Sequence, residues 1–325
     1  MSALLVNFAK GIDPAVEVIS TGEFKRAGSI YREICDVQRA NNYNTEMADF
    51  VNLSLAPLRT EEGAVEYENL LQGDNNILVQ YEYTVGTKIS DKLVRWNKVN
   101  IIKKLLSGAP NAVGRRREFD ITKLLERGDA TSYTHSNDGS TVIDLTGGDG
   151  VATFSASHSS VRTSTTQNNV IRDGTVNNMD LAEDALEAAE TVTRPSITDD
   201  SDQVVELKYS DLFVSRKKSW VAQRLLKTAQ GRVGTPNNDY NLVYGRYRFH
   251  ELAYMDTARD EYWFLKDSEL NAQGDFMTYL EGHGLDKDGP FVDFDTKSVK
   301  YSWSLEFAAG HNLWQSYAGS QGDNT

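Results

Sequence analysis

The sequence predicts an α+β fold, with helices and strands in separate stretches of the chain. From Ile77 to Val85 every second residue is apolar or aromatic, which is the period of a strand. Between Lys88 and Arg127 apolar residues recur at helical spacing instead, and residues 291–310 again have strand-like composition. With 325 residues the chain exceeds what one hydrophobic core usually organises, roughly 250 to 300 residues, so we expect at least two structural units.

The N-terminal part is predicted to be an arm containing a helix that docks through one face. The apolar residues recur at helical spacing, at Phe24, Ala27, Ile30, Tyr31, Ile34 and Val37. Such a face must pack on another surface.

A segment from Arg59 to Asp74 is predicted to form an extended hairpin. It carries two glycine-centred turn signals around a short strand-like run. Its apolar side chains, Val65, Tyr67, Leu70 and Leu71, are too few for a core. We therefore expect the hairpin to lean on a surface outside its own fold.

The helical region 88–127 contains Ser107-Gly108-Ala109-Pro110, so two helices or one kinked helix are both compatible with it, and Gly128 ends it. Residues 131–178 are rich in small polar residues and indicate loop-heavy β structure, with short strands in "STVIDL" (140–145) and "GVATFSA" (150–156). The remaining elements are an acid-capped helix in 177–192, a strand in 204–215, a helix in 217–229, a strand in "DEYWFLKD" (260–267) and strands in 291–310.

Composition excludes several classes of protein. The balance of 34 basic and 47 acidic side chains gives a net charge of −13, which argues against a dedicated nucleic-acid-binding protein. The sequence shows neither a long apolar run nor a signal peptide, so we expect folding in the cytoplasm and no membrane partner. Cys35 is the only cysteine, which excludes an intramolecular disulfide and a cysteine-based metal site.

Enzyme motifs are missing as well. The sequence has no phosphate loop, no dinucleotide-binding glycine pattern and no zinc-protease helix. Ser320, in "AGSQG", lacks the spacing of a nucleophile elbow, and we interpret it as a tail residue. The five histidines never fall at ligand spacing from one another: His135, His158, His250, His283 and His311. We therefore predict no catalytic residue, no cofactor and no metal ligand.

Two charged clusters have simpler explanations than a binding site. In "LDKDGPFVDFD", Gly289 comes too early for a calcium loop, so its aspartates, Asp286, Asp288, Asp293 and Asp295, fit a solvated turn leading into a strand. The basic runs Arg115–Arg117 and Arg216–Lys218 could contact phosphate. Solvated helix faces or partners for acidic neighbouring subunits are the commoner role for such runs.

Several short patterns occur in a telling order. An aromatic-Gly-Ser pattern, Tyr83 to Ser90, precedes the long helix. Asp138-Gly139, Phe154 and His158-Ser159 follow it. Next comes a strand-then-helix pattern, Leu212-Phe213-Val214 with Ala222 and Leu225-Leu226. An asparagine-rich stretch with Asn237, Asn238 and Asn241 then precedes an aromatic strand, Trp263-Phe264-Leu265. Phe307-Ala308-Ala309-Gly310 and Trp314 complete the series.

In this order the chain resembles the major capsid proteins of tailed bacteriophages with the Hong Kong 97 fold, over nearly its whole length. Ser215 departs from the family pattern, because proline is common at that position. The resemblance implies an N-terminal arm (1–52), an extended loop (53–80), a peripheral domain with a spine helix (81–135 and 285–325) and an axial domain (136–284). "DEYWFLKD" is then a core strand of a shell subunit.

The resemblance also implies a function. A major capsid, or head, protein is a structural protein of the virion that assembles as hexamers and pentamers into an icosahedral shell around double-stranded DNA. It is not an enzyme. The expected partners are further copies, a scaffolding protein, a portal and a maturation protease encoded separately, and packaged DNA contacted non-specifically. An acidic inner wall lets DNA slide past without sticking. The candidate inter-subunit residues are Arg59, Val65, Tyr67, Leu70, Leu71, Phe24, Ile30 and Ile34.

Two alternatives stay open at this point. An encapsulin-like protein compartment shares the fold but encloses an enzyme cargo, and DNA inside purified particles separates the two. A cytoplasmic hydrolase with a dispersed acid pair would elute as a small oligomer instead of a megadalton shell.

Two further expectations follow from the family. Some members cross-link a lysine of the extended loop to an asparagine of a neighbouring subunit, but no lysine lies between Leu53 and Gln80, so we expect no covalent cross-links. Because the N-terminal arm before the loop is short, we expect the shell form to keep it instead of cleaving off a long scaffold segment.

Overall fold

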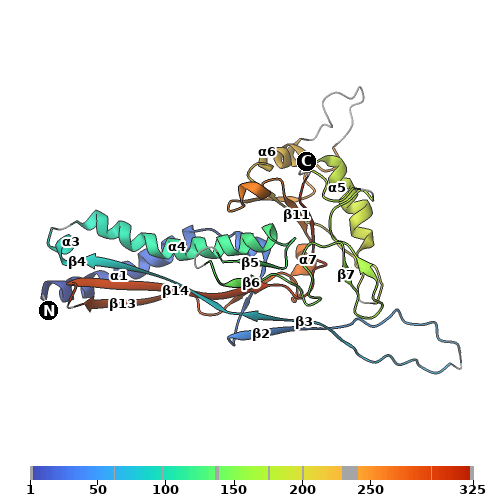
Figure 1. Ribbon diagram of the computed structural model, residues 1–325, viewed down its shortest axis with the longest axis horizontal. Helices are drawn as coiled ribbons and strands as arrows, with labels where there is room; N and C mark the ends of the chain where they lie inside the picture. The colour runs from blue at the N-terminus through green and yellow to red at the C-terminus, as the bar shows by residue number, and fades with distance from the viewer. Residues whose placement is uncertain are drawn as a thin grey trace. The chain divides into compact units, whose positions relative to one another are not determined.

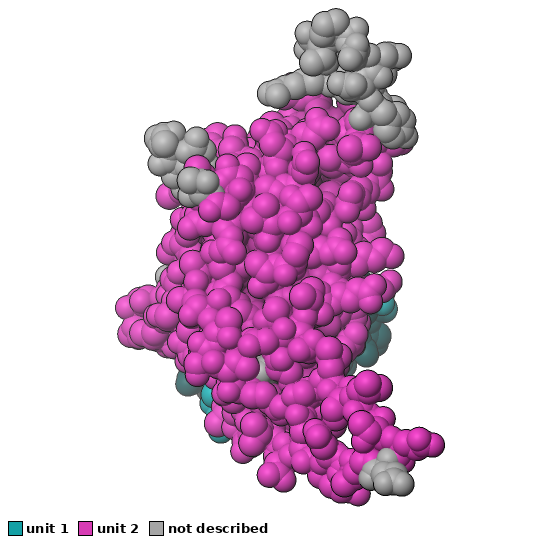
Figure 2. Space-filling model, turned by 90° about the vertical axis from the view of Figure 1, so that its right-hand side faces the viewer, with its two compact units in different colours: residues 1–45, 79–121, 279–309 teal, residues 46–78, 122–278, 310–325 magenta. Residues whose placement is uncertain are grey.

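The computed structural model describes residues 3–61, 63–96, 98–135, 139–174, 176–199, 201–228, 241–293 and 295–322. Asp138, Asn237 and Asn238, which belong to the patterns above, lie outside these ranges. The chain divides into two compact units (Figure 2). Unit 1 comprises 1–45, 79–121 and 279–309, and unit 2 comprises 46–78, 122–278 and 310–325. The length of the chain predicted at least two units, whereas the finer division into arm, loop, peripheral and axial domains stays a prediction.

Unit 1 is built on a five-stranded sheet in the order β1-β12-β14-β13, with β4 also paired to β14. The longest pairing is antiparallel and runs from Ser90 opposite Ser298 to Tyr81 opposite Phe307. These strands are β1 (Asp36–Arg39), β4 (Tyr81–Ser90), β12 (Thr278–Glu281), β13 (Asp286–Asp293) and β14 (Ser298–Gly310). The strands predicted in 291–310 are therefore confirmed.

The helices that begin in unit 1 are α1 (Ala3–Arg26), α2 (Ile30–Ile34), α3 (Asp91–Arg95) and α4 (Val99–Glu126), and Figure 1 draws α4 alongside β4. The Arg116 guanidinium of α4 lies over the Tyr83 ring of β4, 5.3 Å from its centroid. On the same face of the sheet, Trp303 Nε1 of β14 donates a hydrogen bond to Ser20 Oγ of α1 at 2.8 Å. The sheet is thus held to a helix at both β4 and β14.

The structure corrects one expectation for these helices and decides between the two alternatives of another. The predicted helix Phe24–Val37 is broken, because Gly28 has a φ of +141°, outside the helical region, and Val37 lies on β1. At Ser107–Pro110, where two helices or one kinked helix were both compatible with the sequence, the structure has one helix, since α4 runs through Pro110. The break lies earlier, between the end of α3 at Arg95 and the start of α4 at Val99, and α4 ends near Gly128 as expected.

Unit 2 contains a four-stranded sheet in the order β10-β9-β11-β15. Strand β10 pairs parallel to β9, and the other two pairings are antiparallel. The strands are β9 (Asp211–Ser215), β10 (Arg248–Leu252), β11 (Trp263–Lys266) and β15 (Tyr317–Ser320). All four residues of β11 are buried, and Phe264 stacks on Phe154 with ring centroids 5.0 Å apart. The central part of "DEYWFLKD" is therefore a core strand, as predicted.

Short elements surround this sheet. The helical ones are α5 (Glu183–Ala188), which continues as a π-helix (Ala189–Thr193) and a 3-10 turn (Arg194–Ser196), then α6 (Ser219–Lys227), a 3-10 turn (Thr257–Arg259) and α7 (Ser268–Asn271). The two-stranded pairs are β2 (Asn44–Phe50) with β3 (Gln72–Val79), β5 (Ser132–Thr134) with β6 (Val142–Asp144), and β7 (His158–Ser159) with β8 (Thr166–Gln167).

Most of the elements predicted in unit 2 are present, and two predictions are wrong. The stretch "GVATFSA" forms no strand; its Ala152 makes only an isolated bridge with Thr146. Ser320 is not a tail residue, because it lies buried on β15 and its hydroxyl donates to the Met179 carbonyl at 2.6 Å. In the described ranges, no helix is both long and apolar enough to span a membrane.

Candidate inter-subunit surfaces

Residues 51–71 form a long loop that leaves unit 2 between β2 and β3 (Figure 1). The Val51 amide donates to the Leu71 carbonyl at 3.0 Å and closes the base of the loop. Beyond this bond, the described residues of the loop pair into no strands, so the expected hairpin is an open loop. With few apolar residues and several polar ones, the segment has nothing of its own to pack against.

The apolar side chains of this loop are largely exposed. Leu58 is 96% exposed and Tyr67 is 91% exposed. The other exposed members are Leu53, Leu55, Val65, Leu70 and Leu71. A cluster of this kind on one segment is typical of a surface that another chain covers.

The loop is acidic, with Glu61, Glu62, Glu66 and Glu68 against one cation, Arg59. Arg59 Nε donates to the Gly63 carbonyl at 2.8 Å, and the Gly63 amide donates to the Thr60 carbonyl at 3.0 Å. Arg59 therefore fixes the turn at the tip of the loop.

A polar clamp holds the stem of the loop against the rest of unit 2. Arg162 donates to Ser54 Oγ at 2.8 Å and lies 3.4 Å from Glu68 Oε1, while the Ser54 amide donates to Glu68 Oε2 at 2.8 Å. Hydrogen bonds from Ser54, together with Arg162, lower the pKa of Glu68. On the same side, the Ser201 hydroxyl donates to the Asn52 carbonyl at 2.5 Å. The clamp leaves residues 55–67 free of these contacts.

The base of β3 is tied into unit 2 as well. Asn76 Nδ2 donates to the carbonyls of Thr146 at 2.9 Å and His311 at 2.7 Å. Asn312 Nδ2 donates to the Asp74 carbonyl at 3.1 Å. Gln72 to Asp74 thus belong to an anchored strand and not to the free part of the loop.

His158 and His311 lie in a buried polar cluster near this base. His158 Nδ1 is 2.6 Å from Asp149 Oδ2, and its ring stacks on Trp314 with centroids 4.0 Å apart. Burial lowers the pKa of His311 to about 4, so this imidazole is neutral at pH 7. The cluster holds the fold together. Among the described residues, no group of three or more His, Cys, Asp or Glu is arranged to hold a metal ion.

Of the candidate contact residues in the arm, Ile34 is fully buried and Phe24 is half-buried within unit 1. The Phe24 ring lies beneath the Arg117 guanidinium, 4.6 Å from its centre. Ile30 is also half-buried, and its backbone amide bonds to the Glu118 carboxylate. These side chains are covered mainly within their own chain, and their contacts with another copy stay a prediction.

The basic run Arg115–Arg117 is not a solvated face. Arg117 is 3% exposed, its guanidinium lies 3.8 Å from the Tyr31 ring centroid, and it donates to the Gly28 carbonyl at 3.3 Å. Burial raises the pKa of the adjacent Glu118, and Arg117 opposes that rise. Arg116 pairs with Asp120 at 2.6 Å, which leaves Arg115 as the exposed member.

The second basic run, Arg216–Lys218, pairs with carboxylates of its own chain. Arg216 lies 3.4 Å from Glu251, and Lys217 lies 3.1 Å from Asp260. Lys218 lies 2.6 Å from Asp180, and both lysines also contact Glu261. The aspartate cluster of "LDKDGPFVDFD" lies largely on β13 itself, where Asp293 pairs with Lys300 and caps the following turn.

Unit 1 carries an exposed basic surface, opposite in charge to the acidic loop, which we did not predict from the sequence. No acidic residue occurs between Lys92 and Arg117. Over α3 and the first turns of α4, exposed apolar side chains alternate with exposed lysines: Trp96, Val99, Ile101 and Leu105 with Lys92, Lys98, Lys103 and Lys104. The missing acids in this stretch are the signal that the sequence offered. We call these eight residues the cationic face.

Comparison with known proteins gives a consistent answer at the level of fold. No family model matches the sequence, and no curated protein matches it. A solved structure from Mycobacterium phage Adephagia is similar over 92% of this chain and 91% of that one, with 11% identity and a TM-score of 0.52. The chain has the Hong Kong 97 capsid fold.

Two further structures carry this fold. One, from Microbacterium phage Oxtober96, matches 91% of each chain with 14% identity and a TM-score of 0.50. Another is the capsid of bacteriophage JBD30 decorated with minor capsid protein trimers, which matches 70% of this chain and 91% of that one, with 10% identity and a TM-score of 0.51. The Hong Kong 97 fold predicted from the order of short patterns is confirmed, although the sequences are only 10–14% identical.

Proposed function

We propose that the chain is a major capsid protein, whose copies assemble as hexamers and pentamers into an icosahedral shell around double-stranded DNA. The observation that carries the proposal is the anchored but uncovered loop. Its stem is fixed by Arg162 and by the base of β3, whereas Leu55, Leu58, Val65 and Tyr67 remain exposed. A protein that worked as a monomer would gain nothing from ordering the stem of an uncovered apolar loop.

The loop and the cationic face are complementary in charge and in polarity. The loop is acidic and apolar, and the cationic face is basic and apolar. Opposite charges on surfaces that both expose apolar side chains favour association and fix its register. We propose that the loop of one copy covers the cationic face of another, and that Leu70 and Leu71 join this contact at the stem.

The remaining parts of the proposal are supported by the similarity to phage capsid structures. We assign 1–52 to an N-terminal arm, 53–80 to the extended loop, 81–135 with 285–325 to a peripheral domain in which α4 is the spine helix, and 136–284 to an axial domain. The net charge of −13 suits a wall that faces DNA without binding it tightly. Assembly in the host cytoplasm with a separately encoded scaffolding protein, portal and maturation protease completes the proposal, and the role is structural instead of enzymatic.

The proposal is tested by coexpressing the chain with the scaffolding protein encoded beside it, followed by sedimentation and negative-stain microscopy. We expect closed particles, and discrete monomers or small oligomers would overturn the proposal. Nuclease-resistant DNA in particles purified from infected cells supports a virus shell. An enzyme cargo without DNA would instead favour the encapsulin-like compartment.

A further inference from the structure

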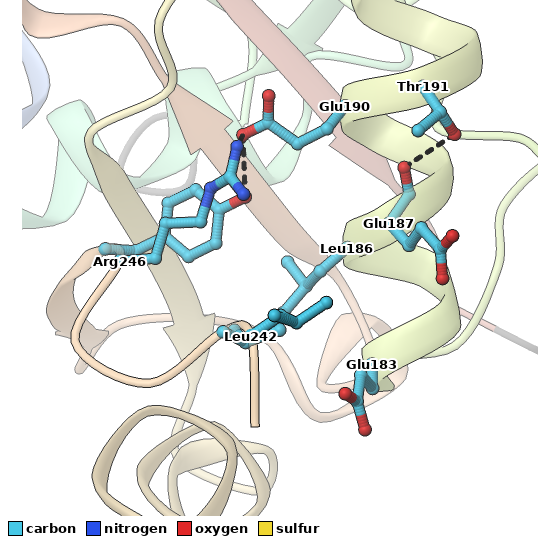
Figure 3. A pocket seen from close by; sticks show the side chains of 9 residues that line it. Glu183, Leu186, Glu187, Glu190, Thr191, Leu242 and Arg246 are labelled. Carbon is cyan, nitrogen blue, oxygen red and sulfur yellow. Dashed lines mark hydrogen bonds and ion pairs between the residues drawn. The ribbon is translucent and has the colours of Figure 1, made fainter. Parts of the chain in front are cut away.

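A shallow pocket opens on unit 2 between α5 with its π-helical extension and residues 242–247 (Figure 3). Its volume is about 150 Å³. That is close to the size of a cavity that holds one benzene ring. Leu186, Val243 and Tyr247 are buried around it, whereas Leu242 is 77% exposed at its edge. The pocket thus offers an apolar floor that is open to solvent on one side.

The rim of the pocket is acidic. Glu190 is already neutralised, because Arg194 lies 2.6 Å and Arg246 lies 3.0 Å from its carboxylate, and the Tyr247 hydroxyl donates to it at 2.8 Å. Glu183 and Glu187, one helical turn apart, have no ion-pair partner within the described part of the chain. The pocket therefore suits an apolar ring that carries positive charge beside it.

The same unit exposes a side-chain set of that description on α6. Trp220 is 77% exposed, and Arg224 and Lys227 are exposed on the same face, four and seven residues further along the helix. Neither Arg224 nor Lys227 has an ion-pair partner within the described ranges. Tryptophan and arginine together are the side chains most enriched at the energetic centres of protein interfaces.

Trp220 does not fill the pocket of its own chain. The C-terminal end of α6 is fixed near residues 241–245, where Asn241 Nδ2 donates to the Leu225 carbonyl at 2.6 Å and the Gly245 amide donates to the Leu226 carbonyl at 3.0 Å. Trp220 lies at the other end of the helix and remains exposed. Leu186 of α5 and Leu226 of α6 pack in the same buried core, whereas Trp220 is not among the residues that line the pocket. One subunit therefore carries both halves of a contact that it cannot make with itself.

We propose that the α6 face of one copy docks in the α5 pocket of the next, with Trp220 over Leu186 and Leu242, and with Arg224 and Lys227 facing Glu187 and Glu183. This inference rests on the proposed shell function and adds a specific contact within each ring. A contact between two different surfaces of identical subunits repeats head to tail, and it closes into a ring when the rotation permits. Such a contact therefore fits a hexamer or pentamer, in which every subunit uses both surfaces.

Charge reversal with rescue tests the pairing in the full chain coexpressed with its scaffolding protein. Arg224→Glu alone and Glu187→Arg alone should each lower the yield of shells, and the double variant should recover it, because the ion pair is restored in the opposite sense. Trp220→Ala should weaken each contact by roughly 30-fold, the usual effect of truncating a central tryptophan. Lys208→Glu, at an exposed lysine of the same unit outside both surfaces, is the matched control and should assemble normally.

A cysteine pair gives an independent readout. Trp220→Cys combined with Leu242→Cys should produce, on a non-reducing gel of oxidised shells, a ladder of up to five or six chains that collapses on reduction. The native Cys35 is buried and does not contribute. Cysteine-variant shells that show only monomers on the gel would overturn the pairing, and so would single charge reversals that assemble like the parent. In either case, shells formed by the parent chain would leave the proposed function intact. Failure of the folded double reversal to recover would also overturn the pairing. A parent chain that forms no shells removes the proposed function, and the inference with it.

Discussion

Replacing residues 55–67 with an equally long Gly-Ser linker should abolish closed shells while leaving the subunit folded. The segment carries Leu55, Leu58, Val65 and Tyr67, all at least half exposed in the isolated chain. Burying four such side chains contributes roughly 6–12 kcal/mol per contact, at about 1.5–3 kcal/mol each. Ordering them costs about 0.5–1.5 kcal/mol each, or about 2–6 kcal/mol in all, which leaves about 5 kcal/mol at the middle of both ranges. A loss of that size lowers the association constant per contact by roughly a thousandfold or more.

The structure also defines where the replacement should begin and end. Gln72 to Asp74 belong to β3, which Asn312 holds through the Asp74 backbone carbonyl, so Gly-Ser residues extending from Arg59 to Asp74 would loosen that strand as well as remove the contact. Ser54 and Glu68 must stay as well, because Arg162 binds both. Restricting the change to 55–67 separates assembly from folding.

The assay is circular dichroism together with sedimentation velocity of the variant and the parent. A matched control changes only Thr60, Glu61 and Ala64 to Gly or Ser, which keeps the apolar side chains and should still give shells. If the 55–67 variant forms shells of normal size and yield, the loop is not an assembly element and the reasoning fails.

Three further predictions concern stability and covalent state. Arg117→Met should lower the free energy of unfolding by about 3–5 kcal/mol in urea denaturation at pH 8, because it leaves Glu118 buried without its counter-charge. Adding Glu118→Gln to Arg117→Met should lower the free energy of unfolding further by much less than the first substitution did, because the two side chains form one pair. A change below about 1 kcal/mol for Arg117→Met alone would contradict the buried pairing. Because burial lowers the pKa of His311 from 6.5 to about 4, the unfolded chain binds the proton more readily. Stability should therefore fall by up to about 3 kcal/mol as the pH drops from about 6.5 to about 4, and His311→Gln should flatten that decline; parallel pH profiles would refute the assignment. Since no lysine lies between Leu53 and Gln80, boiled particles should run as single chains near 36.3 kDa on a denaturing gel. A ladder of covalent oligomers would contradict this prediction.

Local patterns predicted the elements whose packing is encoded in their own composition. The aromatic stretch around Trp263 indicated a buried strand, and β11 is one. Few apolar residues between glycines indicated that residues 59–71 cannot fold alone, and they form an open loop. The order of such patterns along the chain was enough to predict the Hong Kong 97 fold.

Features that depend on distant partners were missed. Ser320 looked like a tail residue because small residues have no strand signature, and its burial depends on pairing with Trp263, far away in the sequence. Arg117 looked solvated because its run is basic, and it is buried only because Phe24 and Tyr31 cover the guanidinium. The helix α1 was missed because Pro14 interrupts its pattern, although the helix continues through it.

The candidate surfaces also differ in whether local composition or distant partners determine them. The exposed loop was predicted from composition, since low apolar content is visible in the sequence. The pocket beside α5 was not, because its floor joins Leu186 to Val243 and Tyr247, which are distant in the sequence. The Trp220, Arg224 and Lys227 spacing on α6 was visible, but its partner surface appears only when the chain is folded.

The central claim is that this chain closes into a shell through its own uncovered surfaces. Cryo-electron microscopy of the chain coexpressed with its scaffolding protein tests it most directly. We expect an icosahedral reconstruction with fivefold and sixfold rings, in which residues 55–67 of each copy lie over α3 and the start of α4 of a neighbour. Particles whose loops touch no neighbouring subunit, or a preparation that contains only monomers and small oligomers, would contradict the claim.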